Sequence, residues 1–543
     1  MVAPDAKSVL TFPSQSPSSV ALLVSLTSAG PRSFLPTHHV GKLWASWLAL
    51  ALAFPWLSPY AAGPTPNVWP WLISAACAVM LWPFQRQLIC RLVATGWVMA
   101  AGLSALIALF QYFGLASDFN PWMSQTQVGE AFGNLRQRNQ LATLMSIGMV
   151  ALIALVALPQ EPGQVSAGRR GIPWWALASA LLLAMGNAAS GSRTGLLQWL
   201  LMAALTAWWV LPGGRRLLMF ALQALLAYGT AVLLLPWLLK LLTNVQIGGL
   251  LGRLAEAPTC ESRKILWSNV LTLIAEKPWL GWGWGELDYA HFITLYAGPR
   301  FCEILDNAHN LPLHLAVELG LPAAAAICGA LSWVVWRARP WAETDPTRQM
   351  AWAVLAVIGL HSLLEYPLWY GPFQIAVGLC VMLLWRPKAV CKTSSPLKKQ
   401  ENLAIVQVFT ALTATILIAF IVYAAWDYRR VSQIYLESSE RDPSLRDNTL
   451  AKISDTKLFR NQFLFAQLGM TPLTASNAQW TYDTATQLLH YSPEPRVIEK
   501  VIESAALLGI DAEAVAHLAR YKAAFPKESA QWLKARTSGA LQT

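Results

Sequence analysis

The chain has 543 residues, 55% of them hydrophobic and only 13% charged, with a formal net charge of +11. Soluble domains carry about 25% charged residues, so this composition excludes an ordinary soluble protein. The positive charges lie in short segments between apolar runs, which argues against nucleic-acid binding and fits the topology of a membrane protein. We therefore predict an all-α polytopic membrane protein.

The hydropathy pattern predicts a disordered leader at 1–41 and a polar helical tail at 427–543. Between them lie eleven apolar runs, each close to the ~20 residues with which a helix spans a bilayer. The runs lie near 42–58, 67–83, 92–115, 139–158, 173–189, 195–212, 217–243, 311–336, 351–369, 373–386 and 404–426. The runs on either side of Gly371 and Pro372 are short, and one kinked helix is the alternative there.

The distribution of Lys and Arg sets the expected topology. One set of loops holds 14 of these residues, whereas the opposite short loops hold 3; the rich loops are 84–91, 159–172, 213–216, 337–350 and 386–403. Cytoplasmic loops are enriched in Lys and Arg, so the first set is predicted to be cytoplasmic. The long loop 244–310 and the tail 427–543 are then expected on the outer face.

The 3 basic residues of the short outer loops are Arg136, Arg138 and Arg193. Arg193 lies in the turn "SGSRTG", where Gly and Ser allow backbone N–H groups to approach an anion. Arg263, in the long outer loop, could grip a phosphate with two hydrogen bonds. The alternatives are a membrane-anchoring side chain for Arg193 and a solvated side chain for Arg263.

The stretch "DNAHNLPLHLAVELG" (306–320) places His309 at the outer end of the predicted eighth span. An imidazole titrates near neutral pH and can accept a proton from a hydroxyl group. Ionisable residues at membrane depth usually have a function, so His309 is the leading candidate for a catalytic base. The alternative is a histidine that only caps the helix. His314, deeper in the same run, is expected to pack or to support the site.

The stretch "HSLLEYPLWYG" (361–371) ends the predicted ninth span. Glu365 is expected near the outer surface and Tyr370 in the turn that follows. Tyr370 is a candidate substrate contact, with an interfacial aromatic residue as the alternative. The run "GWGWG" (281–285) is interpreted as an interfacial element, because its tryptophans favour the headgroup level. Carbohydrate stacking by Trp282 or Trp284 is the less favoured alternative.

Several enzyme classes lack their sequence signals here. The chain has no P-loop, no HExxH motif and no GxSxG serine motif. Asp306 and His309 are too few to predict a metal site, so we expect neither a metal nor a cofactor. A base and arginines at the outer leaflet suit a reaction in which a lipid-linked donor gives up its glycan and its phosphate is the leaving group.

Five stretches together resemble one family, the bacterial protein O-oligosaccharyltransferases, which are relatives of the O-antigen ligases and polymerases. They are "FGNLRQRNQLATLM" (132–145), "SGSRTG" (190–195), "KPWLGWGWGELDYAHF" (277–292), "NAHNLPLHLAVELG" (307–320) and "HSLLEYPLWYG" (361–371). The shorter histidine motif is common to ligases and polymerases. The fuller string that joins "GWGWG", "DYAHF" and "NAHN" resembles the protein-glycosylating branch.

The resemblance implies transfer of a whole glycan from undecaprenyl diphosphate to Ser or Thr hydroxyls of periplasmic proteins such as pilins. It implies an essential role for His309, diphosphate contacts for Arg193 and Arg263, and a functional Tyr370. We add Arg136 and Arg138 to the expected diphosphate contacts, and Asn310 and Glu365 to the expected substrate contacts. The implied location is the bacterial inner membrane, with the site facing the periplasm.

Three rival functions remain. An O-antigen ligase, which uses lipid A core as acceptor, and an O-antigen polymerase share the donor and the chemistry. A transporter of lipid-linked glycans is a rival of another class, and it predicts broken or charged helices in the middle of the membrane, often in repeats. The unusual polar residues of this chain are instead expected at one face, and no repeat is visible in the sequence.

The tail pattern predicts helical hairpins, either as an acceptor-docking module or as a cap without a role in specificity. Two cysteines of the outer loop, Cys260 and Cys302, are a candidate disulfide in an oxidising compartment. On the chain-entropy account such a bond stabilises the folded loop by roughly 4 kcal/mol.

Overall fold

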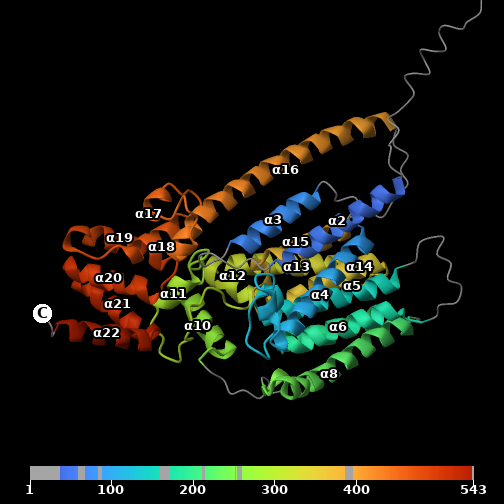
Figure 1. The fold of residues 1–543 in the computed structure, drawn as a ribbon, viewed down its shortest axis with the longest axis horizontal. Helices are drawn as coiled ribbons and strands as arrows, with labels where there is room; N and C mark the ends of the chain where they lie inside the picture. The colour runs from blue at the N-terminus through green and yellow to red at the C-terminus, as the bar shows by residue number, and fades with distance from the viewer. Residues whose placement is uncertain are drawn as a thin grey trace, which may run out of the picture. The chain divides into compact units, whose positions relative to one another are not determined.

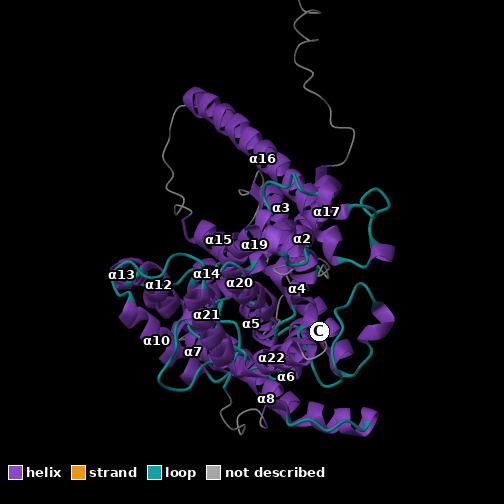
Figure 2. Ribbon diagram, turned by 90° about the vertical axis from the view of Figure 1, so that its left-hand side faces the viewer, coloured by secondary structure: helices purple, strands orange, loops and turns teal. Residues whose placement is uncertain are grey.

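A computed structural model of the chain describes the backbone of residues 37–58, 68–82, 89–158, 171–210, 214–250, 252, 260–385 and 396–540. Within these ranges the backbone forms helices and loops and no strand (Figure 2). The chain divides into two compact units, 1–47 and 48–543. Of the first unit only the helical backbone from Thr37 is described, so 1–36 of the expected leader lie outside the described residues, whereas 37–41 already belong to α2 (Thr37–Leu57) rather than to a disordered leader.

The helices follow one another along the chain as Figure 1 labels them. They are α2 (Thr37–Leu57), α3 (Trp69–Leu81), α4 (Cys90–Tyr112), α5 (Arg138–Ala157), α6 (Trp174–Ser190), α7 (Arg193–Val210), α8 (Arg215–Thr243), α10 (Arg263–Glu276), α11 (Leu287–Ile293), α12 (Leu311–Leu319), α13 (Leu321–Ala338), α14 (Pro346–Ser362), α15 (Gly371–Trp385), α16 (Pro396–Ser432), α17 (Thr449–Lys452), α18 (Arg460–Met470), α19 (Ala478–Leu489), α20 (Pro495–Leu507), α21 (Asp511–Ala524) and α22 (Pro526–Ala540).

Each of the eleven predicted runs coincides with helix, so the prediction of an all-helical membrane protein is confirmed. Among the described residues, five helices are long and apolar enough to cross a membrane. These are Cys90–Tyr112, Arg138–Ala157, Arg215–Thr243, Leu321–Ala342 and Val408–Tyr435. The total of eleven spans and the outward orientation remain predictions. Several of the Lys- and Arg-rich loops on which the orientation rests lie partly outside the described residues.

The core lies between α4, α5, α6 and α14, and small side chains let these helices approach closely. A Cβ added to Gly148 of α5 would stand 2.4 Å from the Cβ of Ala101 on α4. A Cβ added to Gly186 of α6 would stand 2.7 Å from the Cβ of Ala105. Association of membrane helices relies on such close packing, because lipid tails are as apolar as the side chains.

The predicted eighth span, 311–336, is wrong as one continuous helix. The chain breaks at Gly320, whose φ of 85° separates α12 from α13. The backbone around Gly281 packs directly against this break. A Cβ on Gly320 would stand 2.2 Å from the carbonyl oxygen of Trp279. The N–H of Gly283 also donates to the carbonyl of Glu318 at 3.0 Å. Two glycines are therefore needed where the "GWGWG" run docks on the end of α12.

The predicted ninth span, 351–369, is too long. Helix α14 ends at Ser362, and a 3-10 turn at Pro367–Trp369 leads into α15. Proline disfavours helix at the residue before it and lacks a backbone donor, so Pro367 prevents continuation. The alternative of one kinked helix is therefore also wrong, and Glu365 lies in a loop rather than on a helix.

The polar tail forms helical hairpins, with α19 packed on α20 and α20 on α21. Helix α16 runs to Ser432, slightly past the predicted boundary at 427. Helix α11 of the outer loop packs against α21 (Figure 1). At the same contact His490 stacks on Tyr289, with ring centroids 3.7 Å apart, and its Nδ1 lies 2.7 Å from a carboxylate oxygen of Glu286. The outer loop and the tail thus share one hydrophobic core.

Candidate active site

The buried carboxylate of Glu365 is the centre of the candidate site. Its side chain is only 5% exposed, and donors from three separate segments converge on it. The Nδ1 atom of His309 lies 2.7 Å from Oε2, and Gln137 donates to the same oxygen at 3.2 Å. Arg263 forms an ion pair with Oε1, to which Asn139 also donates at 3.2 Å.

This environment favours the ionised form of Glu365. Burial alone would raise its pKa, but the hydrogen bond from His309 and the nearby charge of Arg263 hold the pKa below its usual value. A carboxylate only accepts hydrogen bonds, so Nδ1 of His309 carries a proton. Among the described residues no group is bonded to Nε2 of His309. That nitrogen is therefore free to accept a proton.

Backbone geometry fixes His309 at the outer end of α12. His309 adopts a φ of 51°, which is uncommon for a residue other than glycine, and its N–H donates to Oδ1 of Asn307 at 2.9 Å. Asn310 is the residue that caps the helix, because its Oδ1 accepts from the N–H of Leu313 at 3.1 Å. Its Nδ2 donates to the carbonyl of Leu363, which ties α12 to the loop that carries Glu365.

Two tyrosines extend the site from His309 towards α15. The ring of Tyr366 meets His309 edge-on at 4.9 Å, and Tyr370 stacks on Tyr366 at 5.9 Å. Burial raises the pKa of Tyr370, so its hydroxyl remains protonated at neutral pH and can act as a donor. The sequence indicated Tyr370, whereas Tyr366 was missed because no pattern separates it from an interfacial aromatic residue.

The four predicted arginines lie in different environments. Arg263 begins α10 and is 38% exposed, so it keeps donors free beyond its pair with Glu365. Arg193 is exposed at the start of α7 and pairs with no acid in the described part of the chain. Its neighbour Ser192 donates to Asn139 at 2.6 Å, which links the "SGSRTG" turn to Glu365 through one side chain.

Arg136 and Arg138 flank Gln137 in the sequence, but neither is among the described residues that contact Glu365. Arg136 is exposed, with a φ of 59°. Arg138 forms an ion pair with Glu130 and lines a separate cavity of about 350 Å³ with Ser190 and Gly191. Of the four predicted arginines, only Arg263 is thus paired with the Glu365 carboxylate, and a shared diphosphate site for all four remains a prediction.

A buried polar cluster lies deeper, between α5, α7 and α14. Nδ1 of His361 lies 2.9 Å from the hydroxyl of Thr143, and Gln198 donates to the same hydroxyl at 2.8 Å. Ser146 donates to Gln198 at 3.0 Å. The cluster lies in the first turns of α5 and α7 and the last turn of α14, next to the residues around Glu365. The available signal was the spacing of Asn139, Thr143 and Ser146, which puts polar residues on one helical face.

The "GWGWG" run packs against the end of α12, the helix that follows His309. Trp282 is anchored, because its Nε1 donates to the carbonyl of Leu273 and Lys277 lies over its ring. Trp284 is 61% exposed and stacks on Trp369 at 6.0 Å, next to the buried His314. This arrangement agrees with an interfacial element, and it places His314 in packing rather than beside Glu365.

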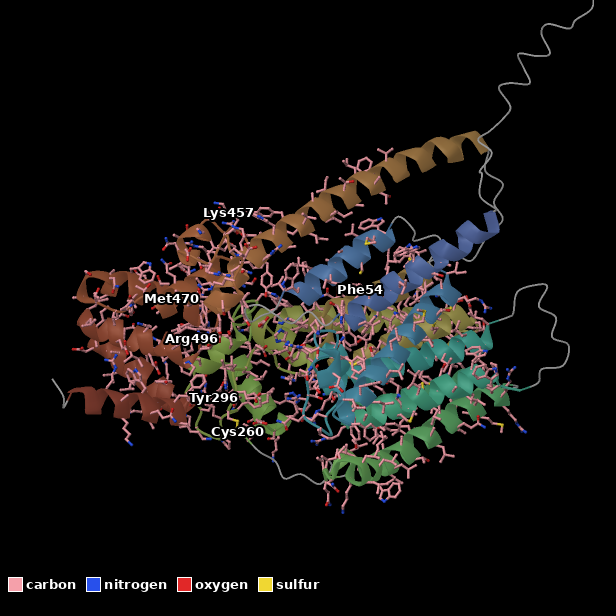
Figure 3. The ribbon with its side chains drawn as sticks, viewed as in Figure 1. Phe54, Cys260, Tyr296, Lys457, Met470 and Arg496 are labelled. Carbon is pink, nitrogen blue, oxygen red and sulfur yellow. A yellow bond between two sulfur atoms is a disulfide. The ribbon has the colours of Figure 1, made fainter. Side chains whose placement is uncertain are left out.

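A disulfide joins Cys260 and Cys302, whose Cα atoms are 5.6 Å apart; Cys260 is labelled in Figure 3. Cys260 lies just before Arg263 and Cys302 just before the His309 segment. Trp267 of α10 also donates to the carbonyl of Ala308 at 3.1 Å. The bond and this contact therefore hold the two segments that approach Glu365.

His291 of the same loop has a structural role. Its Nε2 lies 3.1 Å from the carbonyl of Phe301, and its Nδ1 lies 2.8 Å from the hydroxyl of Tyr296. Burial lowers its pKa to about 3, so this histidine stays neutral. Across the described ranges, no group of three or more His, Cys, Asp and Glu residues could hold a metal ion.

In this helical membrane protein a histidine and an arginine from separate segments meet one buried carboxylate. Three protein families match this chain in sequence: "Protein glycosylation ligase" over 131–156, "O-Antigen ligase" over 178–328, and "Virulence factor membrane-bound polymerase, C-terminal" over 349–538. Together these matches include all the residues around Glu365. The chain is similar in sequence to the O-antigen ligases and to their protein-glycosylating members.

Two curated relatives come from Acinetobacter baylyi (strain ATCC 33305 / BD413 / ADP1). The "General O-oligosaccharyltransferase" is 25% identical over 291 residues, which cover 52% of this chain and 48% of the relative. The "ComP-specific O-oligosaccharyltransferase" is 25% identical over 297 residues, which cover 54% and 51% respectively. The chain thus spans about half the length of the curated relatives it matches.

Proposed function

We propose that this protein transfers a preassembled glycan from undecaprenyl diphosphate to Ser or Thr hydroxyls of periplasmic proteins. The bond between Nδ1 of His309 and the Glu365 carboxylate carries this proposal. It fixes the imidazole tautomer and leaves Nε2 open towards a hydroxyl group. In this role His309 is the general base, and Glu365 is a positioning residue.

The proposed reaction forms one bond and breaks one. The acceptor oxygen attacks the anomeric carbon of the first sugar while Nε2 of His309 takes the hydroxyl proton. The bond between that carbon and the diphosphate oxygen breaks, and its electron pair leaves with the diphosphate. Arg193 and Arg263 would stabilise the charge that develops on the leaving group. No cofactor enters this scheme.

The remaining candidates receive more distant roles in this proposal. The hydroxyl of Tyr370 would donate a hydrogen bond to the lipid-linked substrate. Arg136 and Arg138 would attract its diphosphate by their positive charge. Asn310 contributes through the helix cap. The excess of Lys and Arg in the alternate loops supports a site on the periplasmic face of the bacterial inner membrane. A pilin-like acceptor is proposed from the resemblance to the protein-glycosylating branch, and one relative is named as specific for ComP.

The test is made in cells that lack their own ligase and carry a lipid-linked glycan pathway and a pilin-like acceptor. Intact-mass spectrometry of the acceptor compares wild type, His309→Ala and Arg263→Ala at equal membrane abundance. Lys264→Ala, an exposed neighbour of Arg263, is the matched control. We expect a glycan-sized mass gain with wild type and the control only.

The outcomes separate the rival functions. Glycan on lipid A core, or a lengthened glycan on its carrier, would replace our proposal with a ligase or a polymerase. Full modification of the acceptor by His309→Ala would remove His309 from the mechanism. A transporter would move lipid-linked glycan across the membrane without transferring it to any acceptor.

A further inference from the structure

A groove lies between α3 and α15, which pack side by side (Figure 1). It encloses about 400 Å³. The described lining residues carry no charge, and all but Gln374 are apolar or small. The contacts described around Glu365 do not involve this groove.

The groove starts at the candidate active site. Gly371 is its outermost residue on α15, and it directly follows Tyr370. Tyr370 stacks on Tyr366, which in turn meets His309 edge-on. From Gly371 to Met382 the helix rises ~16 Å, at about 1.5 Å per residue. The groove thus runs from the site through about half of a ~30 Å hydrocarbon layer.

The chemistry of the lining selects an apolar chain. Its two polar side chains already have partners, because the hydroxyl of Ser74 donates to the carbonyl of Pro70 at 2.8 Å and Gln374 donates to the carbonyl of Leu368 at 2.8 Å. Trp71 and Trp82 stand at opposite ends of the lining on α3, with Ala75 and Ala78 between them. An aliphatic chain can lie in such a channel without leaving a polar group unpaired.

The position of the groove favours one lipid over the bulk phospholipid. A chain lying here has its head next to Tyr370, where the reacting diphosphate would sit. A phospholipid headgroup would instead need a basic partner at the groove, and none of the lining residues that the structure describes is basic. We propose that the groove between α3 and α15 binds the polyprenyl chain of the lipid-linked donor. This inference rests on the proposed function and adds the binding site for the donor's tail.

Filling the groove tests this proposal. A Cβ at Gly378 meets no atom within 4 Å, so Gly378→Phe projects into open space without disturbing the helix packing. Gly329 on α13 has the same freedom and lines no part of the groove, so Gly329→Phe is the matched control. Both variants and wild type are assayed as full chains in nanodiscs, with one glycan carried either on undecaprenyl diphosphate or on a two-isoprene diphosphate.

We expect Gly378→Phe to raise KM for the undecaprenyl donor roughly tenfold, because buried apolar surface is lost. Its kcat, and its KM for the short donor, should stay within about twofold of wild type, as should all values for Gly329→Phe. An equal effect on both donors, or no effect on the long one, would overturn the proposal.

A binding measurement separates this proposal from the proposed function. Undecaprenyl diphosphate that carries a diazirine on its chain is photolysed with each variant, and the labelled peptides are mapped. Labelling of α3 and α15 that Gly378→Phe abolishes and Gly329→Phe preserves would support the groove even if wild type transfers no glycan. Labelling elsewhere, or equal competition by phosphatidylethanolamine, would refute the groove whatever the activity.

Discussion

Oε2 of Glu365 lies 2.7 Å from Nδ1 of His309, while Oε1 of the same carboxylate pairs with Arg263. One buried side chain therefore orients the proposed base and holds a proposed diphosphate ligand at the same time. Removing its charge should disturb both functions. The loss should exceed what removal of one hydrogen bond would cause.

We predict that Glu365→Gln lowers kcat by about 10²- to 10⁴-fold, the range typical of a lost general base, without loss of the fold. The amide can donate to Nδ1, and this would favour the tautomer with its proton on Nε2, which cannot act as a base. The pKa of Glu365 is held below its usual value, so in the wild type the ion pair is present at neutral pH and is lost only as the pH falls through that lowered pKa.

The measurement is the pH profile of kcat/KM for wild type, Glu365→Gln and Glu365→Asp. The shorter acid should recover part of the rate, because it keeps the charge but loses the 2.7 Å contact. Equal rates for the amide and the acid variants would show that the charge of Glu365 is irrelevant to the reaction.

The sequence indicated several of the residues that meet at or near Glu365 but not their contacts. His309, Glu365 and Tyr370 stand out as polar or aromatic residues at the ends of apolar runs, and Arg263 as a basic residue of the long loop. Their convergence on Glu365 depends on the break at Gly320 and the end of α14 before Pro367, both of which the hydropathy pattern hides. Hydropathy averages over a window, so a single glycine or proline inside an apolar run leaves little trace.

Asp288 of α11 should make the outer loop less stable as the pH rises. Burial raises its pKa to about 7, so between about pH 4 and pH 7 the folded loop holds a proton that the unfolded chain releases. Stability therefore falls as the pH increases through this window and becomes constant above about pH 7. Asp288→Asn should remove this slope.

Thermal unfolding at pH 5 and pH 8 tests whether stability falls as the pH rises. Wild type and Glu303→Gln, which changes an exposed carboxyl of the same loop, should both lose a few degrees of Tm between the two values. Asp288→Asn should lose less. A Tm that rises with pH in wild type and not in Asp288→Asn would contradict the buried, protonated state of Asp288.

The disulfide between Cys260 and Cys302 should support activity as well as stability. Cys260→Ser is expected to lower stability by up to about 4 kcal/mol and to reduce transfer, since Arg263 and His309 follow the two half-cystines closely. Cys328→Ser, which changes a free and partly buried cysteine, is the control.

Melting curves with and without dithiothreitol distinguish the bond from the packing of the thiols. The reductant should lower the Tm of wild type and Cys328→Ser and leave Cys260→Ser unchanged. A wild-type enzyme that keeps its full rate after reduction would show that the bond stabilises the loop without positioning the site.

The local sequence also explains why the two amides that donate to Glu365 were not predicted. Gln137 and Asn139 lie in "RQRNQ", where the neighbouring arginines dominate the interpretation. Only the start of α5 shows that these amides face Glu365 while Arg138 turns to Glu130. Adjacent residues of one helix point in different directions, so Arg138 and Asn139 meet different partners, and the sequence does not show which partner each one meets.

The two bonds of Asn139 yield the sharpest test of this network. Its Oδ1 accepts from Ser192, which fixes the amide so that Nδ2 faces Oε1 of Glu365. Asn139→Ala removes one donor and should lower kcat/KM by about tenfold, equivalent to ~1.4 kcal/mol. Asn139→Asp places a second carboxylate beside Glu365, so one of the two must take up a proton.

We therefore expect Asn139→Asp to be less active than Asn139→Ala at pH 7, although it is closer in shape to the native side chain. Its rate should recover relative to Asn139→Ala as the pH falls towards 5, because the introduced carboxyl group, once protonated, can again donate to Glu365. Steady-state rates from pH 5 to pH 8 provide the comparison. If the two variants keep a constant ratio across this range, charge at Asn139 does not act through Glu365, and the amide serves packing alone.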